Sequence, residues 1–138
     1  MIQVSDLHEK AMDFAELAFI ARKNGDSAEF QQFSEQAYQL EKTAALLLID
    51  TKTFEISRSI LFRSAASLAI QCGKLHEAES LIDEAFNWSP PVEIAIQLVD
   101  LIKVIQERVY PNASRSFLFS YSPKEGKRKG DELRTGAM

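Results

Sequence analysis

The chain has 138 residues, of which 46% are hydrophobic and 26% are charged, a balance typical of one globular domain. Its five glycines and four prolines are too few for a collagen-like or low-complexity protein, and the lone Cys72 cannot form an internal disulfide. Two histidines and one thiol form no recognisable zinc-binding spacing. We therefore expect no metal, no cofactor and a reducing, cytoplasmic setting.

The formal net charge of −4 is unevenly distributed along the chain. Residues 1–110 carry 10 basic and 17 acidic side chains, whereas residues 111–138 carry 6 basic and 3 acidic ones. An acidic body is a poor surface for a phosphate backbone, so the composition disfavours nucleic acid as a partner. The long apolar stretch at residues 94–109 is interrupted by charged and amide side chains, and residues 1–10 lack a signal-peptide pattern, so we expect neither membrane insertion nor secretion.

The first part of the chain predicts an antiparallel pair of helices. Apolar residues recur at alternating steps of three and four over residues 7–21 and again over residues 30–47, which places each set on one stripe of a helix. Gly25, between them, can adopt the left-handed conformation that ends many helices. We predict helices at about 6–24 and 26–47 whose apolar stripes face each other.

The second part of the chain predicts another pair of helices and a fifth helix. Helices are expected at about residues 54–72 and 75–87, separated by Gly73, and at about residues 90–110, ended by Pro111.

Short polar residues predict where three of these helices begin. Ser5 is expected to cap the first helix. Asp26 and Glu29 have the spacing of a capping box at the start of the second. Ser89, which precedes two prolines, is expected to cap the last helix.

A shift of 48 residues superimposes the two halves of this pattern. It aligns Gly25 with Gly73, and the matched apolar pairs are Phe14 and Phe62, Ala18 and Ala66, Ala21 and Ala69, Phe33 and Leu81, and Ala37 and Ala85. The sequence therefore predicts two copies of one helical hairpin.

The second copy, at about residues 59–92, resembles a tetratricopeptide repeat. The positions that carry this resemblance are Phe62, Ala66, Ala78, Ile82, Ala85 and Pro90. The chain also looks like small, uncharacterised bacterial proteins of the same general kind. The resemblance implies an all-α domain over residues 1–110, in which two antiparallel helical hairpins and a fifth helix form a right-handed stack. Residues 111–138 are expected to form an aromatic and then basic tail that is partly flexible.

In such a stack, the first helix of each hairpin lines a concave face that binds a protein or peptide. The side chains that the resemblance places on this groove are Glu16, Phe19, Lys23, Arg63, Ser64, Ser67 and Gln71. The alternative is that Lys23 and Arg63 only solvate exposed turns.

The fifth predicted helix is apolar on more than one face, although a terminal helix of a repeat stack should have a polar outer face. The residues expected at an oligomer or tail interface are Ile94, Leu98, Leu101, Ile102, Ile105, Phe117 and Phe119. The apolar surface would be covered by the aromatic tail or by a second subunit. Burial wholly within a five-helix bundle is the alternative.

Signals of catalysis are weak in this sequence. It contains no phosphate-binding glycine loop and no nucleophile elbow, and neither His8 nor His76 has a sequence-local catalytic relay. We expect a non-catalytic protein–protein interaction module or adaptor. The alternatives are a structural homodimer formed through the fifth helix and a nucleic-acid accessory protein whose basic cluster at residues 124–129 contacts RNA; that cluster is otherwise a solubilising tail.

Overall fold

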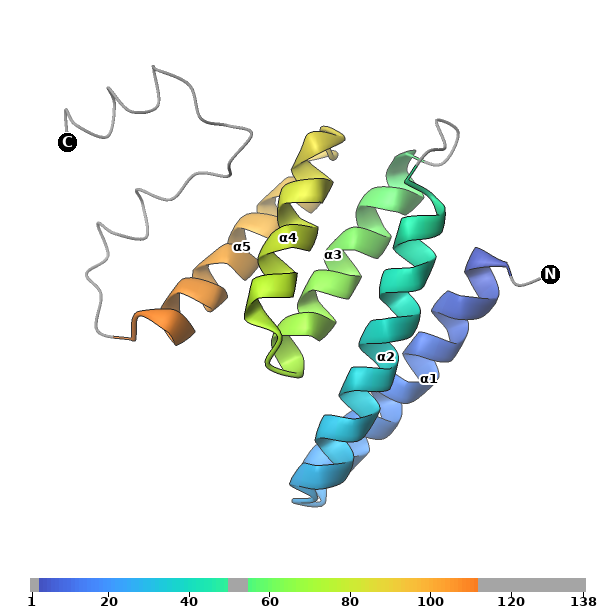
Figure 1. The fold of residues 1–138 in the computed structure, drawn as a ribbon, viewed down its shortest axis with the longest axis vertical. Coiled ribbons are helices and arrows are strands. Elements are labelled where there is room, and N and C mark those ends of the chain that lie inside the picture. Colours follow the sequence, from blue (N-terminus) through green and yellow to red (C-terminus); the bar gives the residue numbers. More distant parts are fainter. Residues whose placement is uncertain (1–2, 50–54, 112–138) are drawn as a thin grey trace.

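The computed structural model describes residues 3–49 and 55–111. They form five helices and no strand, so the described chain is all-α as predicted (Figure 1). The helices are α1 (Val4–Lys23), α2 (Ser27–Leu47), α3 (Glu55–Gln71), α4 (Leu75–Asn87) and α5 (Val92–Val109). The pairs α1–α2 and α3–α4 are antiparallel hairpins. Helix α1 packs on α2, α2 on α3, and both α3 and α4 on α5, so packing follows chain order.

Both hairpins turn at a glycine, as the repeat predicts. Gly25 has φ +76° and Gly73 has φ +85°, which lie in the left-handed region that favours glycine. In the first turn the amide of Asp26 donates to the carbonyl of Ala21 over 2.9 Å, and the equivalent bond in the second turn is 2.8 Å long. These six-to-one bonds are those of the Schellman motif. The two copies are therefore alike at their turns.

The start of α2 is capped as predicted, but the start of α1 is not. The side chain of Asp26 accepts a hydrogen bond from the amide of Glu29 over 3.0 Å. Helix α1 begins at Val4, with Gln3 in the N-cap position and no side-chain cap. The prediction that Ser5 caps α1 is therefore wrong, because the helix starts at Val4, two residues before the predicted start at about residue 6.

Ser89 is likewise not the N-cap of α5. It has φ +52°, and α5 begins at Val92 with Pro91 in the N-cap position. A residue that precedes a proline is disfavoured in the helical region. Pro90 is therefore kept out of helical geometry by Pro91, which delays the start of α5.

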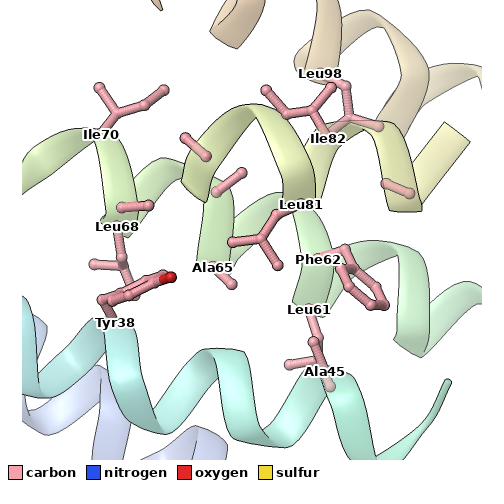
Figure 2. Close-up of a cluster of buried hydrophobic side chains, with 14 of the residues drawn as sticks. Tyr38, Ala45, Leu61, Phe62, Ala65, Leu68, Ile70, Leu81, Ile82 and Leu98 are labelled. Atoms are coloured by element: carbon pink, nitrogen blue, oxygen red, sulfur yellow. The ribbon is translucent and has the colours of Figure 1, made fainter. Parts of the chain in front are cut away.

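The core is centred on α3, which contacts α2, α4 and α5. Figure 2 shows Phe62 and Leu61 of α3 in the same cluster as Tyr38 of α2, Leu81 of α4 and Leu98 of α5. Buried alanines on all three of α2, α3 and α4 leave room for the backbones to approach closely. Burial of these apolar side chains is the main favourable contribution to folding.

The two hairpins share their small core positions but differ at the aromatic one. The matched alanines of α1 and α3, and those of α2 and α4, are buried in both copies. Phe62 is fully buried, whereas Phe14 is half-buried and stacks on Phe33 with ring centroids 6.1 Å apart. The difference arises because α3 has neighbours on both sides, while α1 packs chiefly on α2.

Polar side chains join the two hairpins where α2 passes the α3–α4 turn. These inter-hairpin polar contacts are Gln31 Nε2 to the Cys72 carbonyl (2.9 Å), Gln71 Nε2 to Ser34 Oγ (2.9 Å), Lys74 Nζ to Glu35 (3.0 Å) and the Tyr38 hydroxyl to Glu77 (3.2 Å). Gln31 donates to the carbonyl of Cys72, which follows the last residue of α3 and whose carbonyl has no partner within that helix. The contacts fix how one hairpin sits on the other.

Candidate functional site

The candidate site is the face formed by α1 and α3, which run in the same direction (Figure 1). Each helix carries a row of residues at steps of three and four, which lie on one flank of that helix. The α1 row is Ser5, His8, Met12, Glu16, Phe19 and Lys23, and the α3 row is Ser57, Ile60, Ser64, Ser67 and Gln71. The first two members of both rows line one pocket, so the two rows begin at the same space. We call this surface the α1–α3 face.

Most of the predicted groove residues are accessible on the α1–α3 face. Glu16, Phe19, Lys23 and Ser67 are exposed, and Ser64 is half-buried. The Phe19 side chain is 56% exposed, and the ammonium of Lys23 lies 5.3 Å above the centre of its ring. An exposed aromatic ring beside a cation is a surface that apolar and acidic groups can contact.

Two of the predicted groove residues are engaged elsewhere. Gln71 donates to Ser34 of α2, and Arg63 donates to the side-chain oxygen of Gln97 on α5. Arg63 therefore lies between α3 and α5 rather than between α3 and α1. The sequence placed these residues on the right helix, but the contacts that direct their side chains come from neighbouring helices.

An open pocket of about 540 Å³ lies at the end of the α1–α3 face where both helices begin. Its lining is Gln3, Val4, Ser5, His8, Leu48, Ser57, Ile60 and Leu61. Apolar walls with a few polar groups, and a volume of several hundred cubic ångströms, are typical of small-molecule pockets.

His8 of this pocket is held by a buried carboxylate. Its Nδ1 lies 2.9 Å from both side-chain oxygens of Glu41 on α2. The Glu41 side chain is 0% exposed and that of His8 is 42% exposed. This pair was not predicted from the sequence. The signal that could have indicated a buried carboxylate is the position of Glu41 in the apolar stripe of α2, four residues after Ala37 and three before Ala44.

Two further ionisable groups are buried beside the α3–α4 turn. Burial raises the pKa of the Cys72 thiol, with a smaller opposing effect of Lys74. Burial and the carboxylate of Glu77 raise the pKa of Tyr38. Both groups are therefore neutral near pH 7. Cys72 Sγ lies 3.6 Å from the Ala69 carbonyl, which makes it a packed core thiol rather than an activated nucleophile.

Another pocket, of about 420 Å³, lies between the start of α4 and the end of α5. His76, Glu79 and the buried Gln106 line it. His76 Nδ1 is 4.0 Å from Glu79, and its side chain is almost fully exposed. Among the described residues, no group of three or more histidine, cysteine, aspartate or glutamate side chains is placed to hold a metal ion.

The structure changes the expectation for α5. Ile94, Leu98, Ile102 and Ile105 are buried within the core, and Leu101 is partly buried against it. The apolar residues that α5 exposes are others: Val92, Ile96, Val99 and Val109. We call the first three the α5 outer stripe. The predicted interface residues are thus used within the stack because α5 turns this face toward α3 and α4. Phe117 and Phe119, like the basic cluster at 124–129, lie outside the described residues.

No protein family, curated protein or solved structure matches this chain. Within residues 3–49 and 55–111, no helix is both long and apolar enough to cross a membrane.

Proposed function

We propose that this chain is a non-catalytic interaction module that binds a peptide segment of a partner protein along the α1–α3 face, with its hairpins arranged in a tetratricopeptide-like stack. The observation that carries the proposal is that the two rows begin at one open pocket and that the α1 row continues to the exposed Phe19. A peptide laid along such a face can place apolar side chains against Phe19 and an acidic group near Lys23.

The chemistry of the face favours contacts of this kind. Phe19 offers an aromatic surface of the type that dominates binding energy at protein interfaces. Ser64 and Ser67 of the α3 row are short hydroxyls that can donate to a peptide backbone. In this proposal Phe19 of α1 supplies most of the affinity for the peptide. Ser64 and Ser67 of α3 supply hydrogen bonds, and their side chains are short enough to leave the face open to the peptide.

The proposal is tested by selecting peptides from a random library against the intact chain and measuring their affinity for two variants. Phe19→Glu should weaken binding by about 10-fold or more, since truncation or replacement of an aromatic anchor commonly costs over 1 kcal/mol. Leu17→Glu is the matched control. Leu17 is 42% exposed. It lies on the other flank of α1 from Phe19, because a separation of two residues corresponds to about 200° around a helix.

Peptides that bind Phe19→Glu as tightly as the parent chain, but lose affinity for Leu17→Glu, would place the binding surface on the wrong flank. If the selected peptides lose affinity both for Phe19→Glu and for Ser67→Arg, the result supports a binding surface to which α1 and α3 both contribute. Circular dichroism of each variant establishes that the helices are intact.

The α5 outer stripe favours a second candidate function, a structural homodimer. Val92, Ile96 and Val99 are exposed on one side of α5, at steps of four and three. A second copy that buries this stripe would form a two-fold contact. Sedimentation equilibrium of the chain and of its Ile96→Glu variant tests this function. A monomeric parent chain at micromolar concentration excludes it, whereas a dimer that Ile96→Glu dissociates supports it.

A further inference from the structure

Glu41 occupies a position in the protein interior that is unfavourable for a carboxylate. A carboxylate in the interior loses its hydration and must be compensated by a partner. Among the described residues, the partner that the structure shows for it is His8, whose Nδ1 lies within hydrogen-bond distance of both of its oxygens. A hydrophobic residue of similar size would fill the same position without that cost. The pair therefore has a use that packing alone does not explain.

The contact with Glu41 sets the orientation of the imidazole of His8. When Glu41 is ionised, Nδ1 carries the hydrogen of this bond. The other nitrogen, Nε2, lies on the opposite edge of the ring, away from α2. His8 lines the pocket, and Nε2 is the ring nitrogen that the contact with Glu41 leaves available. In the neutral imidazole, Nε2 is a hydrogen-bond acceptor held in a set orientation.

We infer that this pocket binds a small, uncharged, mostly apolar molecule with a terminal hydroxyl or amide N–H, which donates to Nε2 of His8. Val4, Leu48, Ile60 and Leu61 form apolar walls for the body of the molecule. The hydroxyl of Ser5 or Ser57 can donate to the oxygen of the same terminal group. Glu41 is the positioning residue that keeps Nε2 directed at the ligand.

The charged groups around the pocket favour an uncharged ligand. Among the described residues that line the pocket there is no lysine or arginine. Arg58, which follows Ser57 in the chain, donates to the Leu48 carbonyl over 3.3 Å and lies 4.2 Å above the ring of Trp88. An anionic ligand would therefore approach the Glu41 carboxylate with only the imidazole to offset the repulsion.

The inference goes beyond the proposed peptide binding and is tested separately, with three probes of equal chain length: 1-octanol, methyl octyl ether and octanoate. Octanol can donate a hydrogen bond, the ether cannot, and octanoate is anionic. Titrations followed by amide NMR should show shifts at Ser5, Ser57 and Ile60. Octanol should bind about 3- to 10-fold more tightly than the ether, which is the effect of one hydrogen bond. The Nε2 nitrogen resonance of His8 should shift with octanol and not with the ether.

Two variants complete the test. His8→Phe should make octanol and the ether bind equally. Ile60→Trp, which leaves the His8–Glu41 pair intact, should abolish binding of both by filling the pocket. Leu17→Trp, at an exposed residue of α1 that does not line the pocket, should leave binding unchanged. Equal affinity of octanol and the ether for the parent chain would overturn the inference. So would tighter binding of octanoate, or shifts confined to the α4–α5 pocket.

Discussion

The two hairpin turns allow one substitution to be tested twice in the same molecule. Gly25 and Gly73 have φ values of +76° and +85°, and a Cβ added to either would meet no heavy atom within 4 Å. The effect of alanine at these positions therefore comes from backbone conformation rather than from a clash. Left-handed geometry costs an L-residue about 1–2 kcal/mol. Alanine recovers about 0.4–1 kcal/mol by restricting the unfolded chain.

We expect Gly25→Ala and Gly73→Ala each to lower the free energy of unfolding by about 1 kcal/mol, the difference between these two contributions. The double variant should lose about 2 kcal/mol, because the two substitutions lie in separate turns (Figure 1). Gly25→Asn should lose less than Gly25→Ala, since asparagine tolerates the left-handed region better.

Urea unfolding followed by far-ultraviolet circular dichroism measures these values, with the slope of the transition as a check that unfolding remains two-state. The reasoning is refuted if either alanine variant is as stable as the parent chain. A cost at one turn that is several times the cost at the other would show that the two copies do not share their turn geometry.

Three further predictions concern the core and its ionisable groups. Phe62→Ala should lower the free energy of unfolding by about 3–5 kcal/mol and Phe14→Ala by about half as much, because only the first ring is fully buried; urea unfolding measures both, and equal losses would contradict the difference in burial. Folding raises the pKa of Cys72 and of Tyr38 above their ordinary values of 9.0 and 10.0, so the two groups contribute to stability below these values and the contribution is lost as pH rises above them. The midpoint temperature of thermal unfolding should therefore fall between pH 8 and pH 11, and Tyr38→Phe should make that fall smaller. Glu41→Leu should leave stability unchanged or raise it, whereas binding of octanol should weaken; a large loss of stability would indicate that the buried pair is structural.

Local signals in the sequence were sufficient for the helices and their turns. Gly25, Gly73 and the Asp26 cap act through the backbone of a few residues, so their effects are visible in a short window. The predicted α4 has the bounds that the structure gives it, and the fifth helix differs by two residues at its start. That difference follows from Pro90 and Pro91, whose restrictions on their neighbours outweigh the capping preference of Ser89.

Contacts between helices could not be predicted in the same way. The apolar residues of α5 surround most of the helix, so periodicity alone does not tell which face α3 and α4 will cover. Arg63 was expected in a groove with α1, yet its partner is Gln97 on α5. His8 and Glu41 are 33 positions apart, and only the packing of α1 on α2 brings them together. The sequence therefore did not predict the His8–Glu41 pair, and its groove residues on α1 and α3 stay a prediction.

The inter-hairpin polar contacts mean that the two copies are not interchangeable. Ser34 stands where the second copy has Ile82, and it is matched to Gln71 across the junction. If a copy of residues 59–92 were added after the second hairpin, the copied glutamine would face Ile82, whose side chain offers its amide no acceptor. A chain built in this way does not lengthen by simple duplication, since each hairpin has become specialised for its own place in the series.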